Sequence, residues 1–303
     1  MSLLARPGVA SFAAKSIQCL AVAADRRPNR RGSAAASHSR FPEFPRSVGE
    51  LAVPISVAPA RVVVYLPTSE GPPSPVHVNF HGGGYVMSLT ETDDPLCRFL
   101  AAEAGVAVVN VDYVVAPQHP FPAPPRQAFE VVRWIAEHGG EHGWDGSRPS
   151  VGGQSAGGGL AAAVARQALE EGGPGIALQV LTTRRWSSRR APGASAPPSP
   201  NRCCAPGWER SSTARTSRTR ASAPTGRCPQ RAADTADPKG IAPALLVTAE
   251  YDLLKAEAVR YAERLRRAGT LVEHHDVLGV DHGYDGKDDK KALETYAVIA
   301  RHV

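Results

Sequence analysis

One serine of the chain stands among small residues that suit it for nucleophilic chemistry. Ser155 is the central residue of the run Gly153 to Gly157. The run follows a short predicted strand and precedes an Ala-rich helix predicted over Gly158 to Leu169. On such a strand-to-helix turn the hydroxyl is exposed, and a Cβ at either flanking glycine would collide with the adjoining strand or helix. The run predicts a nucleophile, with a plain Gly-rich turn as the alternative.

A second glycine run, His81 to Gly84, follows the predicted strand Val76 to Phe80. Glycines leave backbone N–H groups free to point into a site and let a substrate approach closely. We expect the N–H groups of Gly82, Gly83 and Ala156 to stabilise the oxyanion of a tetrahedral intermediate, where losing one donor costs about a hundredfold or more in rate. The alternative is a plain Gly-rich turn without a catalytic role. This alternative is disfavoured because the glycine run and the serine turn occur in the same chain, which is the arrangement described for lipases and esterases.

An acid and a base follow two later strands. Asp252 comes after the predicted strand Ala244 to Ala249, and His282 comes after Leu271 to Val277. The chain order of serine, acid and histidine is that of α/β-hydrolases. We expect His282 to take the proton of Ser155 and to return it to the leaving group, while Asp252 fixes the imidazole tautomer.

Other titratable side chains near these positions are weaker candidates. Asp281 is poorly placed to reach the ring of the neighbouring histidine, and Glu250 points the other way along its strand. His274 and His275 lie inside a predicted strand, where partly exposed structural residues are the better interpretation.

The elements that position these residues alternate between strand and helix. Such alternation predicts an α/β fold with a mostly parallel, doubly wound sheet, whose sites gather at the carboxyl ends of the strands. Each motif above falls at such an end. The predicted strands are 61–66, 76–80, 106–111, 151–152, 176–181, 244–249 and 271–277, and the predicted helices are 94–104, 125–138, 158–169, 255–268 and 290–302.

Composition narrows the class of protein. The 303 residues, 42% of them apolar, suffice for one large domain, and no apolar run is long enough to span a bilayer. Five cysteines without a Cys-x-x-Cys pair argue against a disulfide framework and against a zinc site. We expect no metal, no cofactor and a small-molecule substrate. The oligomeric state cannot be read from the sequence.

The net charge of +6 belongs to one segment and does not predict a nucleic-acid partner. Residues 183–231 hold 11 Arg and a single acid, Glu209, so 24 basic and 28 acidic residues remain in the rest of the chain. The same segment has seven Pro and eight Ser, and it contains no Ile, Leu, Val, Met, Phe or Tyr. Such a composition cannot form a buried strand or helix.

The N-terminal segment loosely resembles a secretory signal, with Arg6 ahead of an apolar stretch. Lys15 and Gln18 interrupt that stretch, so an amphipathic helix lying on the protein or on a membrane surface fits better. The polar stretch Arg26 to Arg40 is predicted as a loop between two helices. We expect a cytoplasmic protein.

Taken together, the motifs resemble those of the hormone-sensitive-lipase-like group of α/β-hydrolases. The resemblance spans about residues 60–180 and 238–300. It implies a carboxylesterase for short to medium acyl chains that needs no cofactor. It also implies an N-terminal helical cap, residues 1–50, over a catalytic domain of residues 51–303. The segments that carry the resemblance are His81–Gly84, Asp112-Tyr113, Ala116–Ala123, Gly153–Gly158, Glu250–Asp252 and Asp281–Gly283.

This chain departs from the group at three places. Gln154 and Gln118 stand where the group usually has an acid, and neither change removes a catalytic group. The third departure is the segment 183–231. Back-translation of Thr182 to Ser187 from the third base of the first codon allows Tyr-Pro-Pro-Leu-Val, where the group has a strand ending in Tyr-Pro. We therefore expect a frameshift entered near Thr182 and left near Arg231, with a natural disordered insertion as the alternative.

Two other functions remain open at this point. A non-catalytic or inactive protein on the same scaffold is one, since a frameshift would damage the wall of the acyl pocket. An amidase or lactonase is the other, because the same serine chemistry serves each.

Overall fold

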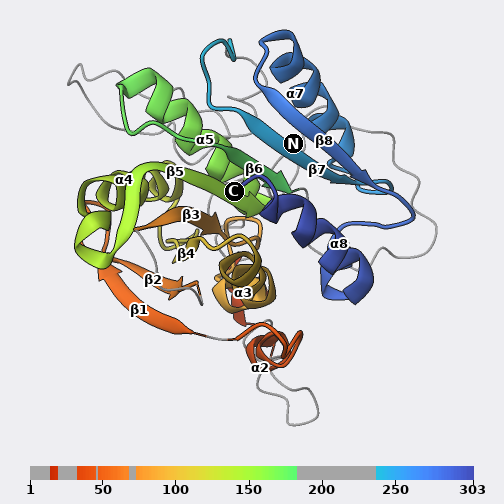
Figure 1. Ribbon diagram of the computed structural model, residues 1–303, viewed down its shortest axis with the longest axis horizontal. Helices are drawn as coiled ribbons and strands as arrows, with labels where there is room; N and C mark the ends of the chain where they lie inside the picture. The colour runs from red at the N-terminus through yellow and green to blue at the C-terminus, as the bar shows by residue number, and fades with distance from the viewer. Residues whose placement is uncertain (1–13, 20–32, 46, 68–72, 183–236) are drawn as a thin grey trace.

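The computed structural model describes residues 14–19, 33–45, 47–67, 73–182 and 237–303, and within them it forms one eight-stranded sheet (Figure 1). The strand order is β1-β2-β4-β3-β5-β6-β7-β8. β2 runs antiparallel to β1 and β4, and every other neighbouring pair is parallel. The predicted mostly parallel α/β sheet is confirmed. The strands are β1 Val48–Val53, β2 Ala60–Tyr65, β3 Ser74–Phe80, β4 Ala107–Asp112, β5 Trp144–Gln154, β6 Gln179–Thr182, β7 Ala244–Ala249 and β8 Leu271–Val277.

Helices cover both faces of the sheet. One core cluster joins α4, α5 and α7 to the sheet, and a second joins α3 and α8 to its other face. The helices are residues 14–19, α2 Ser33–His38, α3 Asp94–Glu103, α4 Ala123–His138, α5 Ala156–Glu171, α7 Lys255–Arg267 and α8 Asp289–Ala300, and the short 3₁₀ turns are η2 Thr90–Asp93, η3 Gly139–His142 and η5 Tyr284–Gly286.

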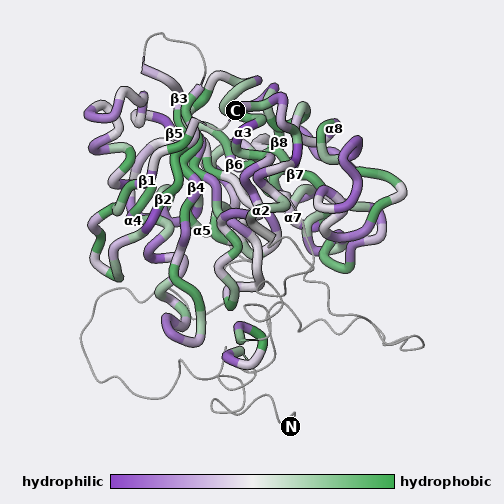
Figure 2. The backbone as a smooth tube through the Cα atoms, turned by 90° about the horizontal axis from the view of Figure 1, so that it is seen from below, coloured by the Kyte–Doolittle hydropathy of each residue, from purple (hydrophilic) through white to green (hydrophobic). Residues whose placement is uncertain are grey.

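The apolar pattern of the sequence explains this layering. β4 is buried along almost its whole length, as expected for a parallel strand covered on both faces. The central strands are correspondingly the hydrophobic part of the backbone trace (Figure 2). In α4, the residues Phe129, Val132 and Ile135 recur at helical spacing and are all buried. The sequence periodicity therefore sets which face of each helix meets the sheet.

Two predictions about the N-terminal part are corrected by the structure. The predicted loop from Arg26 to Arg40 is wrong over Ser33–His38, which forms α2. Three consecutive alanines, 34–36, favour a helix there. β1 was not predicted, because five of its six residues are half-buried or exposed and give only a weak alternation. The boundary predicted after residue 50 falls inside β1, and the division into cap and body remains a proposal.

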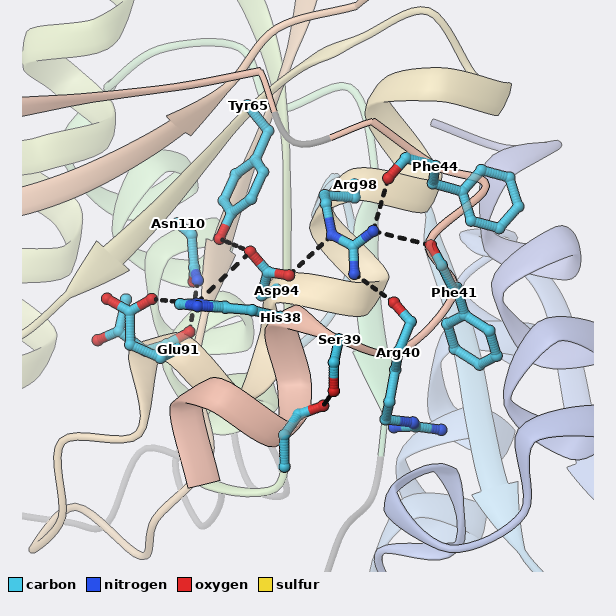
Figure 3. Close-up of polar contacts among 12 residues, drawn as sticks. His38, Ser39, Arg40, Phe41, Phe44, Tyr65, Glu91, Asp94, Arg98 and Asn110 are labelled. Carbon is cyan, nitrogen blue, oxygen red and sulfur yellow. Dashed lines mark hydrogen bonds and ion pairs between the residues drawn. The ribbon is translucent and has the colours of Figure 1, made fainter. Parts of the chain in front are cut away.

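A buried arginine fastens the N-terminal segment to the body (Figure 3). Arg98 of α3 donates to the carbonyl oxygens of Arg40 at 2.5 Å, Phe41 at 2.9 Å and Phe44 at 2.6 Å. Its Nε donates to Asp94 Oδ2 at 2.8 Å. The Arg98 side chain is 2% exposed and that of Asp94 is fully buried, so each charge compensates the other away from water.

Neighbouring polar side chains complete this anchor. Tyr65 donates its hydroxyl to Asp94 Oδ1 at 3.1 Å, and burial together with nearby acids raises the pKa of that hydroxyl, which keeps it a donor. His38, at the end of α2, lies 3.0 Å from Glu91 Oε2 and so ties α2 to η2. Arg40 reaches the other way, with its Nη2 2.7 Å from the carbonyl oxygen of Asp285. The N-terminal segment thus contacts the loop that follows His282.

Several predictions lie outside the described residues. They include the segment 183–231, most of the predicted cap and the first seven residues, 26–32, of the loop predicted from Arg26 to Arg40. Among the helices that the structure describes, none is both long enough and apolar enough to cross a membrane. A cytoplasmic location and a contact with a membrane surface remain predictions.

Candidate active site

The backbone at Ser155 is held in a conformation that few residues other than glycine adopt. Ser155 lies between β5 and α5 with φ 54° and ψ −113°. Its N–H donates to the carbonyl oxygen of Thr182 at 2.7 Å. A Cβ added at Gly153 or at Gly157 would overlap the carbonyl oxygen of Phe80. The two glycines therefore allow β5, α5 and the end of β3 to meet closely around the serine, which is a strained turn of the kind that presents a nucleophile.

The glycine run after β3 passes directly beside this serine. We call residues 81–89 the oxyanion loop. A Cβ added at Gly82 would lie 3.8 Å from Ser155 Cβ. Gly83 and Gly84 have φ values of 115° and 62°, and a side chain at Gly83 would collide with the carbonyl of Met87. The loop thus turns sharply against the serine, while the roles of Gly82, Gly83 and the α5 residue Ala156 as oxyanion donors stay predictions.

His81 supports the oxyanion loop from inside the protein. Its ring is fully buried and stacks on that of Tyr113, with 4.2 Å between the ring centroids. The hydroxyl of Tyr113 donates to the carbonyl oxygen of His81 at 2.9 Å. Burial lowers the pKa of His81, so its imidazole is neutral at neutral pH. His81 and Tyr113 therefore act as structural supports of the loop.

The predicted acid and base form a buried pair. His282 Nδ1 lies 2.5 Å from Asp252 Oδ2, and neither side chain is exposed to solvent. Asp252 Oδ1 accepts a hydrogen bond from the N–H of Leu254 at 2.8 Å, which fixes the carboxylate. A carboxylate bonded to Nδ1 holds the proton on that nitrogen and leaves Nε2 as the basic one.

The competing acids are engaged elsewhere. Glu250 Oε2 accepts from the N–H of Gly279 at 2.7 Å, and Asp281 Oδ1 accepts from the N–H of His282 at 2.7 Å. His274 and His275 are half-buried residues of β8, as predicted, and His274 Nε2 lies 3.0 Å from Thr248 Oγ1. Neither histidine belongs to the arrangement around Ser155.

The predicted residues therefore gather at one edge of the sheet. Gly82 and Ser155 follow the adjacent strands β3 and β5, and Asp252 and His282 follow the adjacent strands β7 and β8. The structure joins these residues in two groups, the glycine loop with the serine and the acid with the base. The approach of His282 to Ser155 stays a prediction. Within the described ranges, no group of histidine, cysteine or acidic side chains has the arrangement of a metal site.

Two contributors to the site were not predicted. Tyr113, which supports the oxyanion loop through His81, had a signal in the sequence, since Asp112-Tyr113 is one of the motifs that carry the resemblance. Gln18, by contrast, contacts residues 68 and 98 positions away, Val86 and Ala116, and no sequence pattern links such distant positions.

Known proteins resemble this chain over most of its length. A family model described as an alpha/beta hydrolase fold matches residues 77–285. Esterase LipI of Mycobacterium tuberculosis is 37% identical over 247 residues, which cover 79% of this chain and 75% of that protein. Carboxylesterase NlhH of the same organism is 35% identical over 234 residues, covering 74% and 70%. The solved structure of an esterase from Pyrobaculum calidifontis has a TM-score of 0.73 and 28% identity, covering 95% and 91%.

These matches agree with the motifs. Hormone-sensitive lipase of Ictidomys tridecemlineatus is 36% identical over 95 residues, which cover 31% of this chain and 12% of that protein. The chain belongs to the α/β-hydrolase fold family, in its hormone-sensitive-lipase-like group.

Proposed function

We propose that this chain is a serine carboxylesterase that hydrolyses small-molecule esters of short to medium acyl chains. Its class, carboxylic ester hydrolase, follows from the esterases that match most of its length. The observation that carries the finer proposal is Ser155 at a positive φ, with the backbone of Gly82 beside it and a buried pair of His282 and Asp252 at the same sheet edge.

In the proposed acylation step, Ser155 Oγ attacks the ester carbonyl carbon while His282 Nε2 removes its proton. The N–H groups of Gly82, Gly83 and Ala156 stabilise the oxyanion that forms on the carbonyl oxygen. Asp252 keeps the other imidazole proton on Nδ1 and stabilises the imidazolium. The intermediate then collapses as His282 protonates the departing alcohol.

Deacylation repeats the same proton transfers with water. His282 removes a proton from a water molecule that attacks the acyl carbon of the ester on Ser155, and the same N–H groups stabilise the second oxyanion. Return of the proton to Ser155 Oγ releases the carboxylic acid and restores the enzyme. All the groups required are side chains and backbone amides, so the scheme needs no cofactor.

The N-terminal residues, 1–50, are proposed to cover this site as a helical cap. In support, Gln18 contacts Val86 of the oxyanion loop, and Arg40 contacts Asp285 close to His282. A cap that reaches both halves of the site limits the space for the acyl chain and the alcohol. The frameshift proposed across residues 183–231 provides the one specific argument for an inactive protein.

A hydrolysis assay with a matched serine control tests the proposal. The wild type is expected to hydrolyse p-nitrophenyl butyrate, and Ser155→Ala to lose this turnover. Ser147→Ala, at an exposed position of the same strand β5, keeps the wild-type rate. Turnover of the corresponding p-nitroanilide at a higher kcat/KM would favour an amidase instead. Folded, monodisperse protein without turnover would contradict the proposal and favour a non-catalytic role.

A further inference from the structure

Gln18 joins the N-terminal segment to two loops of the candidate site. Its Nε2 donates to the carbonyl oxygen of Val86 at 2.7 Å and to that of Ala116 at 2.9 Å. Val86 lies in the oxyanion loop, and Ala116 lies in the loop 113–119 that follows β4, which we call the support loop. Only the amide nitrogen can donate to two carbonyl oxygens, so these acceptors fix the orientation of the Gln18 amide.

Gln118 of the support loop holds the other end of this amide. Its Nε2 donates to Gln18 Oε1 at 3.1 Å, and its own Oε1 lies 3.3 Å from Gln18 Nε2. The group that this chain resembles usually has Glu at this position, and an ionised carboxylate could not donate to Gln18 Oε1. The substitution that looks neutral in the sequence therefore creates a reciprocal pair of amides in this chain.

Val86, one of the two residues whose carbonyl oxygens accept from Gln18, is bonded in turn to Gly83, a predicted oxyanion donor. The N–H groups of Val86 and Met87 both donate to the carbonyl oxygen of Gly83 at 3.2 Å. The N–H of Ala116 donates to the carbonyl oxygen of Tyr85 at 2.8 Å, which ties the two loops together. Because Val86 is part of the same tight turn as Gly83, a displacement of its carbonyl also displaces the N–H of Gly83.

We propose that Gln18 is a positioning residue for the oxyanion hole, oriented by Gln118. It fastens the oxyanion loop to the support loop from the N-terminal segment, without touching the reacting atoms. The proposal rests on the proposed esterase function, because an oxyanion forms only if Ser155 attacks a carbonyl. Misplacing a donor by about 1 Å can cost on the order of a hundredfold in rate, so a residue that holds the loop affects catalysis strongly.

A transition-state analogue provides the readout that a purely structural role would not change. Ser155 Oγ adds to the carbonyl carbon of an aryl trifluoromethyl ketone, its proton passes to His282, and the new oxyanion occupies the hole. In Gln18→Leu, kcat/KM for p-nitrophenyl butyrate is expected to fall about 10-fold or more, and the Ki of the ketone to rise by the same factor. KM should stay within about threefold, since ground-state binding does not use the oxyanion donors.

Two further variants keep the test decisive. Gln118→Leu changes an exposed side chain and should give a smaller change, about threefold, in the same direction for both quantities. Gln167→Leu is the matched control, because Gln167 of α5 also donates to two carbonyl oxygens, those of Pro125 and Ala163, away from the oxyanion loop. It should leave both quantities at their wild-type values.

The possible outcomes separate the two proposals. If the wild type is active and the Ki is unchanged in both Gln18→Leu and Gln118→Leu, the positioning role is overturned. A lower kcat with an unchanged Ki overturns it as well, because that result indicates less active protein and an intact hole. If Gln18→Leu does not fold, Gln118→Leu decides the question. A folded wild type that neither hydrolyses the ester nor binds the ketone overturns the esterase proposal itself.

Discussion

Asp252 and His282 share one hydrogen bond in the interior of the protein, where neither side chain meets solvent. In such a place the carboxylate is effective because water neither screens its charge nor replaces its contact with the imidazole. Leu254 N–H and His282 Nδ1 take one carboxylate oxygen each, which leaves the group little freedom to rotate. The contact of Asp252 Oδ2 with His282 Nδ1 therefore favours the tautomer of His282 that carries its proton on Nδ1.

Asp252→Asn is expected to lower kcat about 10⁴-fold, the size of effect measured for the same change in the serine-protease triad, with the fold retained. The amide can present an N–H to Nδ1, which stabilises the tautomer that lacks a basic Nε2. Steady-state hydrolysis of p-nitrophenyl butyrate measures the loss. Glu250→Gln, at the competing acid two residues earlier, serves as the control and should stay within about threefold, because its amide oxygen can still accept from Gly279. Comparable losses in the two variants would contradict the assignment.

Single functional residues could be predicted from the sequence where their residue type and their spacing from a predicted strand indicate a role. Ser155, Asp252 and His282 could be proposed because each follows a strand that its own neighbours predict. The contacts of Gln18 and Arg98 could not, since each joins segments more than 50 residues apart and each requires the folded backbone.

The helices and strands of this protein differ in whether local sequence or distant contacts stabilise them. α2 has only six residues, too few for a stable helix in isolation, and it forms where the buried anchor around Arg98 fixes the chain that follows it. Strands β7 and β8 begin and end where the sequence predicts. β7 is a mostly apolar run that follows Pro243, and β8 lies between the turn glycines Gly269 and Gly279. Sequence patterns thus predict the elements that pack by their own periodicity, and they miss those that depend on distant contacts.

Arg98→Met is expected to lower the free energy of unfolding by about 3 kcal/mol or more. The substitution removes the guanidinium that compensates the buried Asp94 carboxylate, and it leaves three carbonyl oxygens of the N-terminal segment without their arginine donor. Urea unfolding measures the loss, and trypsin should cleave after Arg40 faster than in the wild type. Arg133→Met is the control, since Arg133 and Glu137 are both more than half exposed and their pair contributes little. Equal stabilities of the two variants would contradict the anchor.

The molecule as a whole depends on one continuous sheet between two layers of helices. β6 lies between β5 and β7, so the sheet is continuous from β1 to β8 on both sides of the segment 183–236, which lies outside the described residues. The overall architecture was predictable because alternating strands and helices permit few arrangements. The frameshift proposed within that segment stays a prediction, and it fails if the gene contains no open alternative frame that resembles the group.

A buried histidine of the central sheet should make stability depend on pH. Burial lowers the pKa of His77 from 6.5 to about 4. As the pH falls through 6.5 the unfolded chain binds a proton that the folded protein does not, so stability is complete above that pH and is lost towards pH 4. This residue alone should remove about 2 kcal/mol between pH 7.5 and pH 5.

His77→Gln should reduce the difference in unfolding free energy between pH 7.5 and pH 5 by about that 2 kcal/mol, whatever its effect on stability at neutral pH. Urea unfolding at the two pH values measures the difference for both proteins. His81, whose pKa burial also lowers, adds to the wild-type loss with the same sign and remains in the variant. An unchanged difference in the variant would contradict the assignment to His77.

The central claim is that Ser155 is the nucleophile, and covalent labelling tests it most directly. An alkyl fluorophosphonate transfers its phosphonyl group to an activated serine hydroxyl and releases fluoride. We expect one adduct per chain, located by mass spectrometry on the peptide that contains Ser155, and loss of esterase activity in proportion to the labelling. Ser155→Ala should remain unlabelled. Activity that persists when Ser155 is fully labelled, or an inactivating adduct on another residue, would contradict the account.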